Sequence, residues 1–108
     1  MKLNFYKHIL LFNLDDLIPG ETIAPELNKR IIRKAVRNSS SPNIPILHYD
    51  KGIIGIVNKM YLIGNSVYMD AVCWRVDEKE MRFAEFGFSF QNIRNPKIME
   101  IYLKRNND

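Results

Sequence analysis

Three apolar stretches joined by turns decide the fold of this chain: residues 45–57 read PILHYDKGIIGIV, residues 61–74 read YLIGNSVYMDAVCW and residues 86–90 read FGFSF. Runs rich in Ile, Val, Tyr and Phe that are bounded by Gly, Asn and Asp are typical of β-strands, and the pair Gly64-Asn65 indicates a hairpin. We therefore expect neighbouring strands here, with His48 at the end of one strand and Ser89 inside another.

The alternation of apolar and polar residues extends this pattern in both directions along the chain. It predicts strands over residues 1–14, 44–49, 53–62, 67–76, 81–91 and 97–104. Residues 77–80, which are mostly acidic, are expected to be an exposed connection, and Asn95-Pro96 a turn before the last strand.

One amphipathic helix is expected over roughly Pro25 to Arg37, because proline favours the first helical position and the Ser- and Asn-rich loop 38–43 ends the pattern. At 100° per residue, one side of this helix is apolar and the other is basic. The apolar side carries Leu27, Ile31, Ile32 and Ala35. The basic helix face carries Lys29, Arg30, Arg33, Lys34 and Arg37.

These elements define the expected fold class as α+β. The architecture would be a β-rich, curved antiparallel sheet or small barrel with one amphipathic helix in the N-terminal third. A length of 108 residues predicts a single domain over residues 1–108.

The composition bounds the class of protein and its partners. The formal charge of +4 permits an acidic partner, and 46% hydrophobic with 26% charged residues is ordinary for a globular domain. No apolar run approaches the ~20 residues of a membrane-spanning helix, and we expect no membrane partner. Cys73 is the sole cysteine, so a reducing compartment is expected: the cytosol, including that of an infected cell, or an assembling virion.

His48 and Ser89 are the candidate catalytic residues. An imidazole at the end of an apolar strand and a hydroxyl on a nearby strand can form a base and its nucleophile. Gly87, two residues before Ser89, leaves space for a substrate backbone to approach. The alternative is that both residues are structural, His48 as a satisfied strand-end histidine and Ser89 as a serine bonded to a carbonyl.

The basic helix face is the second candidate site. Five cations on one side of a helix can bind phosphates or an acidic protein surface. No helix-turn-helix pair and no aromatic RNA-binding signature accompanies them, so direct nucleic-acid binding is not the favoured interpretation. A solvated face without a partner is the alternative.

Metal and cofactor chemistry find no support in the sequence. His8 has no ligand at metal spacing, the carboxylates are scattered, and there is no glycine-rich phosphate loop. We expect no metal and no cofactor.

The order of motifs resembles the tailed-phage prohead, or capsid maturation, serine proteases, which are assemblin-like in fold. The resemblance lies in Ile18-Pro19-Gly20 before a helix, in His48-Tyr49-Asp50 after an apolar strand, and in Gly55-Ile56-Val57, Gly64-Asn65 and Phe88-Ser89-Phe90. It implies that His48 is the general base, that Ser89 is the nucleophile and that Gly87 contributes to the oxyanion hole. Lys104-Arg105 stands where that family has an acidic residue that orients the histidine.

Three functional hypotheses follow from these observations. The first, implied by the resemblance, is a serine endopeptidase acting on capsid or scaffold protein. The second is a non-catalytic phage-encoded binding module or inhibitor of a host protein, for example a nucleic-acid-binding defence nuclease, that uses the basic helix face or a sheet edge. The third is a subunit that self-associates into an oligomer through the aromatic segment Phe83–Phe90.

Overall fold

The computed structural model describes residues 2–16, 29–39, 42–91 and 94–105. In chain order the elements are β1 (Asn4–Asn13), the 3₁₀ turn η1 (Leu14–Asp16), α1 (Lys29–Asn38), β2 (Ile44–His48), β3 (Gly52–Ile63), β4 (Ser66–Cys73), α2 (Glu78–Phe83), β5 (Phe86–Gln91) and β6 (Lys97–Leu103). The predicted α+β class is confirmed: a strand-dominated fold with a sheet curled into a half-barrel.

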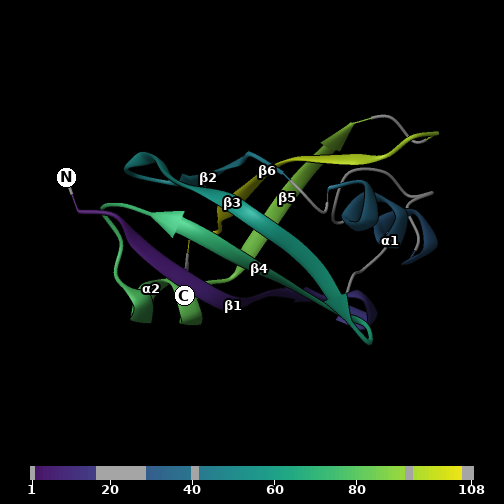
Figure 1. The fold of residues 1–108 in the computed structure, drawn as a ribbon, viewed down its shortest axis with the longest axis horizontal. Coiled ribbons are helices and arrows are strands. Elements are labelled where there is room, and N and C mark those ends of the chain that lie inside the picture. The colour runs from purple at the N-terminus through teal and green to yellow at the C-terminus, as the bar shows by residue number, and fades with distance from the viewer. Residues whose placement is uncertain (1, 17–28, 40–41, 92–93, 106–108) are drawn as a thin grey trace.

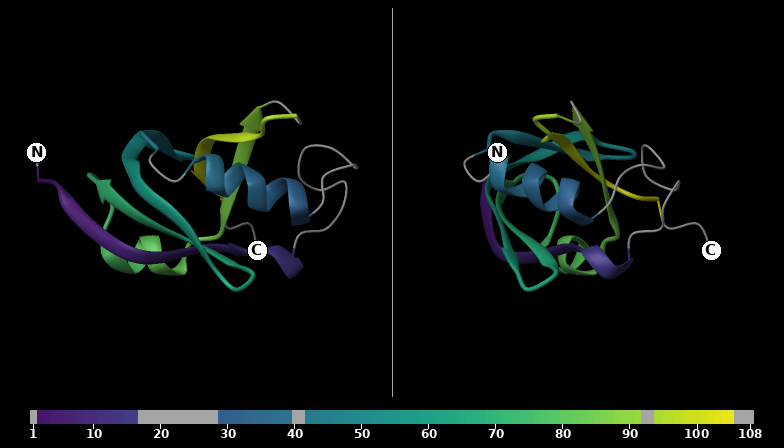
Figure 2. Two further views of the ribbon diagram at one scale, coloured as in Figure 1. Left: turned by 45° about the vertical axis from the view of Figure 1, so that its right-hand side comes forward. Right: turned by 90° about the vertical axis from the view of Figure 1, so that its right-hand side faces the viewer.

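The six strands form one sheet in the order β1-β4-β3-β2-β6-β5. All neighbouring pairs are antiparallel except β2 and β6, which are parallel through Ile46 opposite Ile101 and Leu47 opposite Tyr102. Figure 2 (right) looks along the curled sheet, with β1 in purple and β5 in green as its borders. The sheet is thus open between its first and last strands.

The alternation of apolar residues along the strands places the core on the inner face of the curled sheet. β4 alternates strictly, burying Val67, Met69, Ala71 and Cys73 while the residues between them stay partly exposed. α1 packs against β3 and β6 and buries Ile32, Ala35 and Val36. Since a sheet with one apolar face must cover it, α1 and the curl together close the core.

Two sequence predictions for the segment before β5 are wrong. The predicted strand 81–91 begins only at Phe86, and the predicted connection 77–80 opens the helix α2. Asp77 caps α2, because its carboxylate accepts a hydrogen bond from the Glu80 amide at 2.7 Å. An N-cap Asp followed three residues later by Glu is a helix-start signal that outweighs the apolar alternation.

The other boundaries follow the predictions more closely. β4 ends at Cys73 instead of Val76, and α1 is described from Lys29 onward. The turn Ile18-Pro19-Gly20 and the predicted helix start at Pro25 lie outside the described residues. No helix in the described ranges is long and apolar enough to cross a membrane.

Gly55 is the point where β3 and β4 approach too closely for a side chain. A Cβ at this position would lie 2.7 Å from the Val72 carbonyl oxygen and 2.7 Å from Cys73 Sγ. The carbonyl belongs to the ladder and cannot move without breaking the pairing of Gly55 with Cys73.

We therefore expect Gly55→Ala to lower the free energy of unfolding by about 1–3 kcal/mol, as overpacking does. Urea unfolding followed by circular dichroism measures this. The control is Ile63→Ala on the same strand. The Ile63 side chain is exposed, so its truncation is expected to change the free energy of unfolding by less than about 0.5 kcal/mol. Equal effects in the two variants would contradict the close approach at Gly55.

Candidate functional site

His48 ends β2 and is buried, with its side chain only 3% exposed. Its Nδ1 accepts hydrogen bonds from the backbone amides of Asp50 at 3.0 Å and Lys51 at 3.2 Å. Its Nε2 lies 3.1 Å from Glu80 Oε2. The ring also stacks on Tyr49, with centroids 4.2 Å apart.

These contacts fix the tautomer of His48. Nδ1 faces two N–H donors, so it carries the lone pair, and the proton lies on Nε2, which donates to Glu80. Both ring nitrogens are therefore engaged by the fold, and neither is directed at a serine hydroxyl. In this geometry His48 joins the β2–β3 turn to α2.

Glu80 was not predicted from the sequence as a partner of His48. It comes from the first turn of α2, and its second oxygen lies 3.9 Å from Lys51 Nζ. The pattern Asp77-x-x-Glu80 could have located the helix, but nothing in the sequence indicates that it turns toward β2. The acidic partner of His48 is thus Glu80 from α2. Glu100 on β6 is not that partner, because it lies opposite Ser89.

Ser89 lies on β5, and the structure does not bring it to His48. Strand β6 separates β5 from β2, and Phe88 and Ile46 are both level with Ile101. His48 and Ser89 are separated by two strand spacings across the sheet and by three residues along the strands, which places them roughly 14 Å apart. A nucleophile and its base need contact at about 3 Å.

Gly87, the predicted oxyanion contributor, is buried beneath an aromatic ring. A Cβ on Gly87 would lie 2.3 Å from Tyr102 Cζ, so the Tyr102 ring covers this glycine from the neighbouring strand. An aromatic ring over a strand glycine is a packing device of sheets. The space at Gly87 is occupied by Tyr102.

The five residues of the basic helix face divide into two groups. Three of them bond within the fold: Lys29 to Asp15, Arg33 to the Asn65 side chain, and Lys34 to the Arg94 carbonyl. The hydrogen bond from Lys29, followed by that from Asn65, lowers the pKa of Asp15. Arg30 and Arg37 are exposed and make no hydrogen bond or ion pair with the described residues.

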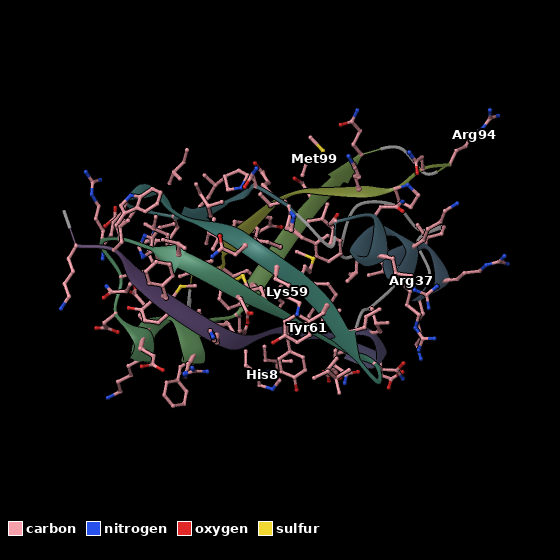
Figure 3. The ribbon with its side chains drawn as sticks, in the orientation of Figure 1. His8, Arg37, Lys59, Tyr61, Arg94 and Met99 are labelled. Carbon is pink, nitrogen blue, oxygen red and sulfur yellow. The ribbon has the colours of Figure 1, made fainter. Side chains whose placement is uncertain are left out.

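A cluster around His8 lies on the outer surface of β1, β3 and β4, where Figure 3 labels His8, Tyr61 and Lys59. His8 has a positive φ of 59° at a bulge in β1. Its amide donates to Asp70 Oδ1 at 2.9 Å, its Nδ1 lies 3.0 Å from the Tyr61 hydroxyl, and its ring stacks on Tyr68 at 4.1 Å.

Tyr61 completes this cluster. Its hydroxyl donates to Asp70 Oδ1 at 3.3 Å, and burial, followed by the charge of Asp70, raises its pKa. Lys59 Nζ lies 5.3 Å from the centre of the same ring, within the range of a cation–π contact. A left-handed histidine is strained, and these contacts hold it in place. No pattern in the sequence predicts the bulge.

Other reactive groups in the described residues are few. Burial raises the pKa of the Cys73 thiol to about 11, which keeps it protonated and a poor nucleophile. No group of three or more His, Cys, Asp or Glu among the described residues could hold a metal ion.

Comparisons with protein-family models, with curated proteins and with solved structures found no match for this chain. The resemblance to prohead proteases therefore stays a prediction from short motifs.

We expect His48→Ala to lower the free energy of unfolding by about 2–3 kcal/mol, because it leaves the amides of Asp50 and Lys51 without their acceptor. Thermal and urea unfolding measure the change. His48→Asn is the matched variant, since its side-chain oxygen can accept from the same amides and should recover part of the loss. A fully stable His48→Ala would contradict this structural role.

Proposed function

We propose that the protein is a non-catalytic binding module that docks on an acidic surface of a partner protein. The observation that carries this proposal is a concentration of cations at one end of the molecule. We define the basic end as five residues from α1 and the segment that leads into β6. They are Arg30, Lys34, Arg37, Arg94 and Lys97.

Internal contacts hold the two parts of the basic end together. Lys34 Nζ donates to the Arg94 carbonyl at 3.2 Å, and the Asn38 side chain donates to the Pro96 carbonyl at 2.8 Å. Arg37 and Arg94 extend outward at this end in Figure 3. A fixed set of like charges attracts a surface of opposite charge and orients it.

The geometry at His48 supports a binding module over an enzyme. His48 is bonded on both ring nitrogens, Ser89 lies across β6, and Tyr102 covers Gly87. An endopeptidase would need all three features rearranged. The serine-protease hypothesis is thus less well supported than the binding-module hypothesis.

A protein partner fits the basic end better than a nucleic acid does. Residues 29–38 and 94–99 contain no aromatic residue, and base stacking on aromatic rings is a main contribution to single-strand binding. The resemblance to phage proteins makes capsid proteins, scaffold proteins and host factors the candidate partners.

The protease alternative is tested by labelling with a fluorophosphonate probe. We expect the folded protein to show no more labelling than Ser89→Ala, since a serine without a nearby base is not activated. Trypsin serves as the positive control for the probe. Labelling that disappears in both Ser89→Ala and His48→Asn would overturn the non-catalytic proposal.

The basic end is tested with a fluorescent poly-glutamate peptide and the double variant Arg30→Glu/Arg37→Glu. We expect binding that weakens with salt and falls about tenfold or more in this variant, as for the loss of two charge contacts. The matched control is Lys2→Glu/Lys79→Glu, which changes the net charge equally at exposed sites outside the basic end. Its expected loss is less than about threefold.

Equal losses in the two double variants would show that net charge alone drives binding and would contradict a site. Tighter binding of single-stranded DNA of the same charge would favour a nucleic-acid partner instead. Circular dichroism of each variant verifies that the fold is retained.

A further inference from the structure

A cavity of about 540 Å³ lies at the basic end of the molecule. It is placed where four elements meet, since α1 and β5 end beside it and β2 and β6 begin beside it. Met99 on β6, which lines this cavity, is labelled in Figure 3. The volume is within the range of cavities that bind ligands. We call this cavity the end pocket. Its lining includes Asn43, Gln91 and Lys97 as polar residues and Pro42, Ile44 and Met99 as apolar ones.

Hydrogen bonds hold the wall of the end pocket where α1 meets β6. Ser39 is only 5% exposed, and its hydroxyl donates to the Ala35 carbonyl at 2.8 Å and accepts from the Ile98 amide at 3.1 Å. The Asn38 side chain donates to the Pro96 carbonyl at 2.8 Å. A ligand therefore meets a wall that is already fixed, which lowers the entropic cost of binding.

The polar part of the end pocket offers hydrogen-bond donors that the fold leaves unused. Asn43, Gln91 and Lys97 are exposed, and within the described ranges none of their side chains makes a hydrogen bond or an ion pair. Gln91 lies directly opposite Lys97 in the pairing of β5 with β6, so their Cβ atoms are about 5 Å apart on the same face of the sheet. An ammonium group beside carboxamide N–H groups is a set of donors suited to an anion.

The remaining part of the end pocket is apolar. Ile44 and Ile98 belong to the buried core, and Met99 beside them is 47% exposed. Pro42 adds further apolar surface. An apolar side chain placed here would be removed from water together with Met99, which favours binding. The end pocket thus suits a ligand that carries an anionic group and an apolar group close together.

The donors of the end pocket fit a carboxylate better than a phosphate. Lys97 is the single charged residue among the described residues that line the pocket, and one ammonium group balances one negative charge. Phosphate groups are more often held by arginine forks or by rows of backbone amides. The carbonyls of Ala35 and Val36 at the end of α1, which would repel an anion, accept hydrogen bonds from Ser39.

The carboxyl terminus of a protein chain has the required combination of groups. It joins one carboxylate to the side chain of the last residue, and the capture of chain termini is a recurring mode of peptide recognition. A terminus with an apolar last residue would meet both the polar and the apolar lining of the end pocket.

We propose that the end pocket binds the carboxyl terminus of the partner protein, where that chain ends in an apolar residue. The terminal carboxylate would accept hydrogen bonds from Lys97 Nζ and from the carboxamides of Asn43 and Gln91. The last side chain would pack against Ile44 and Met99. This proposal rests on the proposed function, since the charges of the basic end bring the partner to the pocket. It adds a preference for one end of a chain, which charge attraction alone does not supply.

The test begins with a library of random short peptides that are displayed on phage with free carboxyl termini and selected against the full chain. Enriched peptides are synthesised with a free carboxyl terminus, with a terminal amide, and with a terminal amide plus a glutamate added at the amino end, which restores the net charge. Fluorescence anisotropy measures their affinities. We expect the free acid to bind about tenfold or more tightly than either amide, because the amides place no terminal carboxylate in the end pocket.

Matched variants locate this binding on the protein. Lys97→Gln removes the charge of the end pocket and is compared with Lys79→Gln, an exposed site on α2. Met99→Asp is compared with Ile63→Asp, since the two residues are 47% and 54% exposed and Ile63 lies outside the pocket. Each pocket variant should weaken binding of the free acid about tenfold or more, and each control less than about twofold.

The charge-neutral double variant Asn43→Ala/Gln91→Ala separates the end pocket from the basic end. It should weaken binding of the free acid about fivefold or more and leave binding of poly-glutamate unchanged, whereas Arg30→Glu/Arg37→Glu should weaken poly-glutamate. Binding of poly-glutamate without any preference of the peptides for the free acid would overturn the end pocket and leave the proposed function standing. A preference for the free acid without poly-glutamate binding would support the end pocket and contradict the basic end as a docking surface.

Three further results would overturn the end pocket as a site for a chain terminus. They are no enrichment over an unrelated protein, equal affinities of the free acid and the charge-matched amide, and equal losses in the pocket and control variants. Equally tight binding of N-acetyl-leucine would replace the chain terminus with a small carboxylate as the ligand. Circular dichroism of each variant guards against a loss of fold as the cause, and Asn43 and Gln91 are exposed residues whose truncation should leave the fold intact.

Discussion

The parallel pairing of β2 with β6 is the contact on which the rest of the structure depends. Four strands from the first part of the chain form one antiparallel set, β1-β4-β3-β2, and β5 with β6 forms a second. Among the described residues, the alignment of Ile46 with Ile101 and of Leu47 with Tyr102 joins the two sets into one sheet. Ile46 and Ile101 are fully buried, so this junction is also the centre of the core.

The same junction explains why the candidate catalytic residues do not meet. A direct pairing of β2 with β5 would have brought His48 and Ser89 to adjacent strands. Because β6 lies between them, each residue has local partners instead: Glu80 for His48, and Glu100 opposite Ser89. The histidine then serves the fold, since it holds the β2–β3 turn and α2 together through both ring nitrogens.

The basic end gives this protein a surface for recognition. It offers long-range attraction that depends on salt. The edges of an open sheet are liable to pair with other chains. Here Arg82 covers only part of the β1 edge, at Lys7 and His8. Further along β1, the ring of Phe12 stacks on that of Phe88 from β5 at 4.9 Å.

The sequence by itself determined the class of the fold and most of its strands, because apolar alternation reports which residues face a core regardless of what lies opposite. It also located the hairpin at Gly64-Asn65 and the basic helix face, which depend on neighbours close in the chain. It contained the signal for α2 in Asp77 and Glu80, although the alternation after Met81 obscured it.

Only the tertiary structure decided which strands are neighbours, and therefore which side chains meet at the candidate site. The contact of His48 with Glu80, the cover of Tyr102 over Gly87 and the stacking of His8 on Tyr68 all join residues distant in sequence. The bulge at His8 likewise follows from the pairing of β1 with β4. Such contacts are chosen by how whole strands pack together, and local periodicity carries no information about that choice.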